Sequence, residues 1–290
     1  MKIMKSTLDY STETEQIKDW LSSSKTVIVG AGAGLSAAGG INYMDEQLTA
    51  EWFPEYVKIG LKTIVDIQGI FWNITPENAR AYYAFWARHI WNVRYKSDVL
   101  QPYTDLYRLL QGKDYFIITT NVDRQFTKAG FDENRILATQ GDYGLFQCSV
   151  PCTREVYNNR EQVERMVNHI VDDYYVRRKD IPLCPRCGNF LIPNLRKDKS
   201  FIEEIHMKNL PAYSQYVDMA KRKKITLLEL GVGFNTPVVI RYPFENITRQ
   251  YPNNVRMIRV NLSNATVPIF IRHHSLSAET DIAGLLKSLF

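Results

Sequence analysis

The sequence predicts an α/β fold, in which a Rossmann-like, doubly wound parallel sheet is joined to a smaller lobe made of a helical module and a four-cysteine ribbon. Three observations lead to this prediction. Four short apolar runs are each followed by Gly or Asn, one long segment is rich in aromatic residues at helical spacing, and the four cysteines form two close pairs. Short apolar runs are typical of strands buried on both faces of a parallel sheet.

A helix is expected before the first strand, because residues 12–24 carry apolar side chains at Ile17, Trp20 and Leu21. The runs expected to form strands are 26–29, 115–120, 225–230 and 255–260. The residues that directly follow these runs are Gly30, Asn121, Gly231 and Asn261. In a doubly wound sheet, ligands bind beyond the carboxyl ends of the strands, so functional residues are expected at these positions.

Two segments depart from the strand pattern and are assigned to the smaller lobe. Residues 46–111 hold many aromatics at helical spacing and predict a helical module, whose aromatics form a core or line a cleft. Residues 146–194 contain all four cysteines. The remaining segments, 1–45, 112–145 and 195–290, are assigned to the Rossmann-like domain.

The cysteine spacing predicts a metal site. Cys148 and Cys152 form one pair, Cys184 and Cys187 form the other, and 31 residues separate the pairs. Two such turns complete a tetrahedral site of four thiolates, which is the preference of structural zinc. Because all four positions are cysteines, no ligand position is open for catalysis. The alternative is a set of four buried free thiols.

The overall charge favours acidic ligands such as a dinucleotide, since the formal net charge is +5 and the pI is about 8.9. The basic run 221–224 is interpreted as the solvated end of a helix, and no nucleic-acid partner is expected. The first ten residues lack an apolar leader, and no stretch reaches the roughly 18 apolar residues of a membrane span. We therefore expect a cytoplasmic protein without a membrane partner.

A glycine-rich turn follows the first strand, with the sequence Gly30-Ala31-Gly32-Ala33-Gly34-Leu35-Ser36. Small residues allow the backbone to approach a pyrophosphate, and the amides that open the next helix donate hydrogen bonds to it. The spacing differs from the dehydrogenase fingerprint, so tight packing of the turn is the alternative.

Four blocks stand out along the chain. They are the glycine-rich turn, the segment Thr120-Asn121-Val122-Asp123, the split four-cysteine ribbon, and Gly231-Val232-Gly233-Phe234-Asn235-Thr236. In the order and spacing of these blocks, the chain resembles the sirtuin family from about residue 15 to its C-terminus. The resemblance implies a Rossmann-like NAD domain, a lobe built of a helical module and a zinc ribbon, NAD as substrate, and structural zinc.

The resemblance also implies roles for individual residues. Asn121, Asp123 and Gln140 are expected to be catalytic and to contact NAD, with Asn121 beside the nicotinamide ribose and Asp123 on the nicotinamide carboxamide. The remaining NAD contacts that it implies are the first-turn residues Gly30, Ala31, Gly32, Ser36 and Ile41, the second-loop residues Gly231, Gly233 and Asn235, and the adenosine-ribose residue Asn261.

Two departures from the family pattern bear on the reaction. The family usually reads Gly-Ile-Pro-Asp-Phe-Arg where this chain has Gly40-Ile41-Asn42-Tyr43-Met44-Asp45, and it has His-Gly where this chain has Gln140-Gly141. That histidine is the general base of deacylation. An amide accepts no proton near neutral pH, and loss of one general base costs about 10²–10⁴-fold in rate. The usual deacylation route is therefore disfavoured.

Cleavage of the nicotinamide–ribose bond depends less on proton transfer than deacylation does, because nicotinamide leaves as a neutral base. The change of His to Gln resembles the class M, macrodomain-linked sirtuins. That resemblance implies a protein ADP-ribosyltransferase whose acceptor is a lipoylated carrier protein related to the glycine cleavage H protein, with a macrodomain hydrolase as a further partner.

The alternatives are an NAD-dependent protein-lysine deacylase with another base, and a non-enzymatic NAD-sensing module. In the deacylase alternative, an unidentified base or water takes the place of the missing histidine. The five histidines of the chain are candidates for that base, but all are expected on the surface or in packing: His89, His169, His206, His273 and His274.

Overall fold

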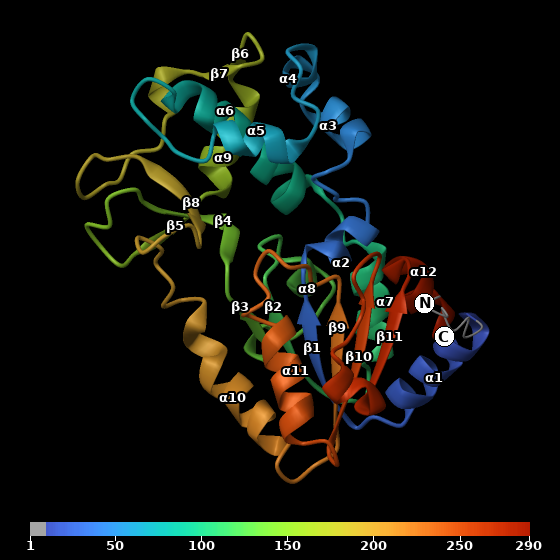
Figure 1. Ribbon diagram of the computed structural model, residues 1–290. Helices are drawn as coiled ribbons and strands as arrows, with labels where there is room; N and C mark the ends of the chain where they lie inside the picture. Colours follow the sequence, from blue (N-terminus) through green and yellow to red (C-terminus); the bar gives the residue numbers. More distant parts are fainter. Residues whose placement is uncertain (1–9) are drawn as a thin grey trace.

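A six-stranded sheet forms the centre of the larger lobe in the computed structural model, which describes residues 10–290. Residues 1–9 of the expected Rossmann-like domain lie outside this described part. The strand order is β11-β10-β9-β1-β2-β3, and every neighbouring pair is parallel (Figure 1), which confirms the predicted α/β fold. The strands are β1 (Thr26–Ala31), β2 (Asp114–Thr119), β3 (Ile136–Ala138), β9 (Ile225–Leu230), β10 (Val255–Asn261) and β11 (Ser275–Glu279).

The four apolar runs form the four inner strands, and every residue of β1 and of β9 is buried. Successive side chains of a strand point to opposite faces of the sheet, so Val27 and Val29 pack in one core cluster and Ile28 packs in another. The edge strands β3 and β11 are absent from the prediction. The first has only three residues, and the second includes the polar residues Ser275, Ser277 and Glu279.

Helices cover both faces of the sheet (Figure 1). One face packs against α1 (Tyr10–Ser22), α7 (Gln101–Leu109) and α12 (Ile282–Ser288). The other face packs against α10 (Leu210–Met219) and α11 (Arg241–Gln250). Two short helices near the carboxyl edge are α2 (Ala33–Ala38) and α8 (Gln125–Lys128). The 3₁₀ helices cover Glu133–Arg135, Arg178–Asp180, Met207–Asn209 and Ile269–His274.

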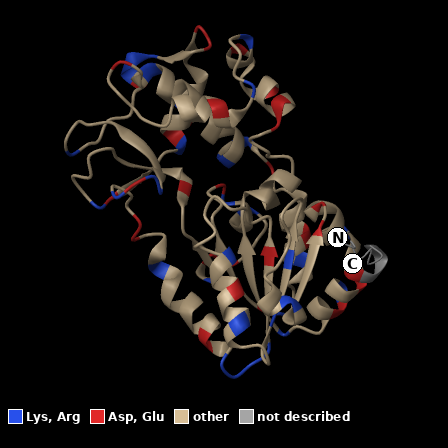
Figure 2. Cartoon of the chain, viewed as in Figure 1, with Lys and Arg blue, Asp and Glu red and all other residues tan. Residues whose placement is uncertain are grey.

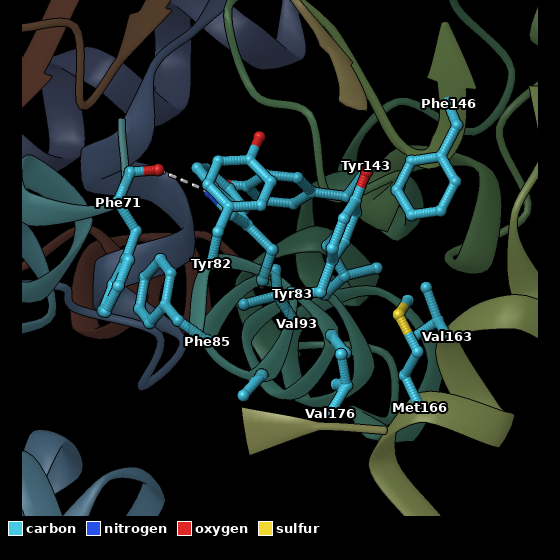
Figure 3. Packing of buried hydrophobic residues seen from close by; sticks show 14 of the residues in the cluster. Phe71, Tyr82, Tyr83, Phe85, Val93, Tyr143, Phe146, Val163, Met166 and Val176 are labelled. Carbon is cyan, nitrogen blue, oxygen red and sulfur yellow. Dashed lines mark hydrogen bonds between the residues drawn. The ribbon is translucent and has the colours of Figure 1, made fainter. Parts of the chain in front are cut away.

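The smaller lobe has one hydrophobic core, shared by its helices and its cysteine-bearing segment (Figure 3). Tyr83 and Phe85, on the longest helix of this lobe, pack in the same cluster as Val163, Met166 and Val176. The helices are α3 (Glu46–Trp52), α4 (Pro54–Lys58), α5 (Ile64–Ile70), α6 (Ala79–Ile90), a π-helix (Trp91–Lys96) and α9 (Arg160–Asn168). The strands are β4 (Gly141–Cys148), β5 (Val156–Asn158) and β8 (Leu191–Leu195), which form an antiparallel sheet, and the hairpin of β6 (Ile170–Val171) and β7 (Tyr175–Val176).

Helix α7 packs on the sheet, although its sequence lies in the segment expected to form the helical module. Its Tyr103 and Leu106 are fully buried in the cluster that contains Val29 and Leu228. The periodicity of α7 indicates which of its faces is apolar, but it does not indicate which lobe that face contacts. This packing places the Tyr103 hydroxyl under the loops at the carboxyl edge of the sheet.

The basic run 221–224 forms the exposed turn between α10 and β9, where Figure 2 shows basic residues at the amino edge of the sheet. It therefore lies at the opposite edge from the loops that follow β1 and β9. Within residues 10–290, no helix is both long and apolar enough to cross a bilayer.

The four cysteines come together as their spacing predicts. Their Sγ atoms all lie within 4.8 Å of one another, with Cys148 and Cys184 buried and Cys152 and Cys187 exposed. The backbone N–H and then the side chain of Asn189 donate to the Cys187 sulfur, and they lower its pKa to about 6, which favours the thiolate. A compact set of four sulfur ligands fits structural zinc. The segment is therefore a zinc ribbon that shares the core of the helical module.

We expect Cys184→Ser to release the metal and to destabilise the smaller lobe. Zinc content measured by atomic emission should fall from about one ion per chain to near zero, and the melting temperature should fall by roughly 10 °C. The control is Arg186→Ala, at a position between the ligands Cys184 and Cys187, which removes only an exposed ion pair with Glu155. Unchanged metal content and melting in Cys184→Ser would instead indicate free thiols.

The glycine-rich turn packs directly on the turn that follows β9. The Gly34 amide donates to the Gly231 carbonyl at 3.0 Å, and the Gly32 amide donates to the Leu230 carbonyl at 3.0 Å. A Cβ built on Gly32 would lie 2.5 Å from the Gly231 oxygen, and one on Gly34 would lie 2.7 Å from the Gly231 Cα. Gly231 itself has a φ of +63°, in the left-handed region. The absence of side chains here is required by packing between the two turns.

We therefore expect Gly34→Ala to destabilise the fold by about 1–3 kcal/mol, because the added methyl group meets backbone atoms that cannot move independently. Urea denaturation measures this change. The matched control is Gly69→Ala in α5, where an added Cβ meets nothing within 4 Å and the free energy of unfolding should stay equal or rise by about 0.5–1 kcal/mol. A wild-type midpoint for Gly34→Ala would contradict the close packing of the turns.

Candidate active site

The loops that follow β1, β2 and β3 meet at the carboxyl edge of the sheet, beneath the smaller lobe (Figure 1). The sheet register brings two of the candidate residues together. Thr119 pairs with Ala138, so Asn121 and Gln140 each follow a neighbouring strand by two residues. The amide of Thr139 also donates to the carbonyl of Thr119 at 3.0 Å. Residues 19 positions apart in the sequence thus follow adjacent strands of the sheet.

Asn121 is the centre of a hydrogen-bond network. Its Nδ2 donates to the Gly32 carbonyl at 2.9 Å and to the Tyr103 hydroxyl at 2.9 Å, and it lies 3.3 Å from the Ser36 Oγ. Its backbone amide donates to the Thr119 Oγ1 at 3.0 Å. These contacts fix the orientation of the carboxamide against the glycine-rich turn.

Asp123 completes the network on its buried side, since the residue is only 5% exposed. The Ser36 hydroxyl donates to its Oδ2 at 2.5 Å, and the backbone amide of Gln125 donates to its Oδ1 at 3.0 Å. Burial raises the pKa of this carboxyl, and the two hydrogen bonds oppose that rise. Burial and the neighbouring Asp123 charge also raise the pKa of Tyr103 well above its usual value. Tyr103 therefore stays a neutral hydroxyl at physiological pH.

Gln140 lies at the start of the connection to the smaller lobe and is half-buried. Its backbone carbonyl accepts a hydrogen bond from the backbone amide of Arg196 at 3.0 Å, and the Arg196 Nε donates to the backbone carbonyl of Thr139 at 3.0 Å. The next residue, Gly141, has a φ of +109°, and a Cβ there would lie 2.1 Å from the Asn194 oxygen. Backbone geometry therefore requires glycine after Gln140.

A narrow cavity of about 40 Å³ lies at the ends of β2 and β3, with room for roughly one water molecule. Asn121, Asp123 and Gly141 line it, together with Arg124, Asp142 and His206. The structure thus brings Asn121 and Asp123 to one cavity, whereas Gln140 is not among its lining residues, although its neighbour Gly141 is.

His206 lies in a segment that connects β8 to α10, and it packs there as expected, but it also reaches the cavity. Its half-buried ring lines the same cavity, its Nε2 lies 2.5 Å from the Asn194 Oδ1, and it stacks on Phe201 at 5.5 Å. Burial lowers the pKa of this imidazole, which is therefore neutral at physiological pH. Nothing in the sequence around His206 indicates this position, because it arises from the return of the chain after β8.

Three further residues at the site were not singled out as site residues from the sequence. Tyr103 comes from α7, and Arg196 follows β8. Arg124 directly follows Asp123 in the loop after β2. Its φ of +63° is rare for an arginine, and its guanidinium pairs with Asp142 at 3.1 Å and with Glu133 at 3.3 Å. All three depend on contacts between segments distant in the sequence.

The other first-turn residues are placed differently. Gly30 and Ala31 belong to β1 itself and are buried, and a Cβ on Gly30 would lie 2.4 Å from the Ile240 side chain. Ile41 donates its amide to the Ser36 carbonyl at 3.0 Å and packs in the core cluster of the smaller lobe. It therefore links the glycine-rich turn to the other lobe.

The residues after Ile41 that differ from the family pattern make contacts within the smaller lobe. Asp45 caps α3, where its Oδ1 accepts from the amides of Gln47 at 2.8 Å and Leu48 at 3.0 Å. The Tyr43 ring packs edge-on against the buried His89 at 4.9 Å. This segment is therefore anchored to the smaller lobe.

The second loop lies at the ends of β9 and β10. The Asn261 Nδ2 donates to the Val232 carbonyl at 3.3 Å, and Gly231 is buried against the first turn. Gly233 and Asn235 are exposed. This loop therefore offers accessible backbone and side-chain groups next to the glycine-rich turn.

Comparison with known proteins finds relatives over most of the chain. A protein ADP-ribosyltransferase of Staphylococcus aureus (strain Mu50) is 30% identical over 280 residues, which cover 95% of this chain and 86% of that protein. A protein of Fusarium oxysporum f. sp. cubense, named "Probable bifunctional ADP-ribose hydrolase/ADP-ribosyltransferase", is 29% identical over 265 residues, which cover 87% of this chain and 43% of that protein. No protein-family model matches the chain.

Solved structures of Sir2 proteins share the fold. The structure of Sir2Tm bound to a propionylated peptide has a TM-score of 0.60 at 18% identity, and covers 95% of this chain and 96% of that one. A Sir2 complex with a p53 peptide and NAD⁺ has a TM-score of 0.55 at 17% identity, with 95% and 96% covered. These structures establish the sirtuin fold, and the Staphylococcus relative establishes the family. The chain therefore belongs to the protein ADP-ribosyltransferases with the sirtuin fold.

Proposed function

We propose that this chain is an NAD-dependent protein ADP-ribosyltransferase, which cleaves the nicotinamide–ribose bond of NAD and transfers ADP-ribose to a protein acceptor. The observation that carries the proposal is the buried network of Asn121, Ser36, Asp123 and Tyr103, with the amide of Gln140 at the neighbouring strand end. The family membership of the chain supports the same reaction.

The reaction needs orientation and electrostatic support more than proton transfer. When the bond between the ribose C1′ and the nicotinamide nitrogen breaks, its electron pair leaves with nicotinamide, which departs as a neutral molecule. Positive charge develops on the ribose, and polar groups held in fixed orientations stabilise it without reorganising. A nucleophile of the acceptor then forms the new bond to C1′ and releases its proton to water.

Asn121, Asp123 and Gln140 are assigned to the nicotinamide end of this reaction. The contacts that hold the Asn121 amide and the Asp123 carboxyl in fixed positions support this assignment. We assign the phosphates and the adenosine of NAD to the first turn and the second loop. The residues of this assignment are Gly30, Ala31, Gly32, Ser36, Ile41, Gly231, Gly233, Asn235 and Asn261. In this proposal the Rossmann-like domain holds NAD, and the smaller lobe faces the acceptor.

The acceptor that we propose is a lipoylated carrier protein related to the glycine cleavage H protein, and a macrodomain hydrolase would remove the modification. The resemblance to class M sirtuins supports both partners. The name of the Fusarium relative combines an ADP-ribose hydrolase with an ADP-ribosyltransferase, which is in keeping with the second partner. We place this reaction in the cytoplasm.

Protein-lysine deacylation is the second candidate, because His206 brings an imidazole to the cavity that Asn121 and Asp123 line. Its Nε2 lies within hydrogen-bond distance of the Asn194 Oδ1, so that nitrogen is engaged. Incubation with labelled NAD separates the candidates. Label on the carrier supports transfer, O-acyl-ADP-ribose from an acylated peptide supports deacylation, and bound but intact NAD indicates a sensing module.

We expect Asn121→Ala to lower transfer of label from NAD to the carrier by about 10²–10³-fold, since it removes an oriented polar group beside the reacting bond. Stability should fall by only about 1–2 kcal/mol, the value of the lost hydrogen bonds. The control is Asn134→Ala, an exposed amide whose side chain contacts Asp132. Transfer at the wild-type rate in Asn121→Ala would remove this residue from the mechanism.

We expect Gln140→His to yield no robust deacylation of an acylated peptide. An imidazole at this position restores the base, but Tyr43 and Asp45 remain anchored to the smaller lobe in place of the family's loop. Mass spectrometry of O-acyl-ADP-ribose measures the outcome, with the unmodified chain as reference. Abundant product from the variant would show that Gln140 alone suppresses deacylation.

A further inference from the structure

A buried ionic cluster lies beneath the second loop, on the strands and the helix that support it. Glu229 of β9 and Arg259 of β10 are paired in the sheet register and are 1% and 0% exposed. Their side chains form two hydrogen bonds, at 2.6 Å and 3.0 Å. From α11, Glu245 contacts Arg259 at 2.9 Å, and Arg241 lies 3.8 Å from Glu229 and 3.9 Å from Glu245. Two positive and two negative charges thus balance inside the protein.

Such a cluster is an unusual way to fill a protein interior. Removing charged groups from water carries a large desolvation cost, and apolar residues of similar volume often stabilise a fold as well or better. Burial accordingly raises the pKa of Glu229 and lowers the pKa of Arg241. The cluster differs from a simple ion pair, because its arginines also donate to backbone carbonyls outside it.

Those carbonyls belong to the loops that follow β9 and β10. Arg241 donates to the Val232 carbonyl at 3.3 Å in the first loop, and to the carbonyls of Asn264 at 2.8 Å and Thr266 at 3.2 Å in the second. Arg259 also donates to the Thr266 carbonyl, at 2.9 Å. One guanidinium therefore contacts the backbone of both loops.

The same loops carry the groups assigned to adenosine. The Val232 carbonyl that Arg241 holds also accepts from the Asn261 Nδ2 at 3.3 Å. The Arg241 guanidinium lies 4.2 Å from the ring centre of Phe234, which is 55% exposed next to Gly233 and Asn235. Arg241 thus contacts the backbone before this exposed segment and the aromatic ring within it.

We propose that Arg241 is a positioning residue for the adenosine half of NAD, which fixes the loops after β9 and β10 relative to each other. This inference rests on the proposed function. A lysine at this position would keep the charge, but its single ammonium group lacks the planar fork that reaches three carbonyls in two directions. Selective loss of affinity for the adenosine part is therefore the expected consequence of Arg241→Lys.

The test compares two ligands by calorimetry. Nicotinamide mononucleotide contains only the nicotinamide half, whereas NAD contains both halves. For Arg241→Lys we expect the Kd for NAD to rise about 10-fold or more, the Kd for nicotinamide mononucleotide to change less than about 2-fold, and kcat of transfer at saturating NAD to stay within about 2-fold. The control is Arg249→Lys, an exposed arginine of the same helix that lies over Phe270; both affinities should remain at wild-type values.

Equal weakening of both ligands, unchanged NAD affinity, or a lower kcat at unchanged NAD affinity would overturn the proposal. If Arg241→Lys fails to fold, the charge-balanced pair Arg241→Met with Glu245→Gln replaces it and must show the same selective loss. Failure of the proposed function looks different, because the wild-type chain would then bind no NAD or transfer no label. If the wild-type chain binds NAD and transfers label, and the variants bind NAD and nicotinamide mononucleotide as tightly as the wild type, only the role of Arg241 is refuted.

Discussion

The contact between the backbones of two glycine turns determines how the carboxyl edge of this sheet is built. Gly32 and Gly34 lie against Gly231 so closely that an added Cβ would stand 2.4–2.9 Å from atoms of the opposite turn. The turn after β1 thereby becomes continuous with the turn after β9, at the place where the strand order reverses direction. Doubly wound sheets bind their ligands at this reversal, so the contact that closes the fold also forms the floor of the candidate site.

Chemistry at this edge follows from how the polar groups are held. Ser36, on the helix that leaves the first turn, connects to Asp123 and Tyr103, and Asn121 reaches back to the Gly32 carbonyl. Hydrogen bonds in such a buried network strengthen one another and fix the side chains in one arrangement. The amide of Gln140, at the next strand end, adds polarity without a proton-accepting nitrogen. This combination favours breaking a bond that releases a neutral leaving group.

The smaller lobe is held together by a hydrophobic core that the zinc ribbon and the helices share. Cys148 and Cys184 are buried in the cluster that contains Phe85 and Met166. Ile41 joins this cluster while its amide contacts the Ser36 carbonyl of the glycine-rich turn. Order in the lobe is therefore coupled through a few residues to the position of the turn. The ribbon contributes to the site through this connection and lies outside the hydrogen-bond network around Asn121.

Local apolar runs and short spacings in the sequence predict the inner strands, the sheet class, the cysteine site and the place of Asn121 and Asp123 after the run 115–120. Gln140 is expected only from the family resemblance, because the strand before it, β3, is not predicted. Tertiary structure alone decided that α7 packs on the sheet, that β3 and β11 extend it, and that Tyr103, Arg196 and His206 reach the site. These features arise from contacts between segments tens of residues apart. Local pattern shows which face of an element is apolar, whereas its partner is chosen only when the whole core packs.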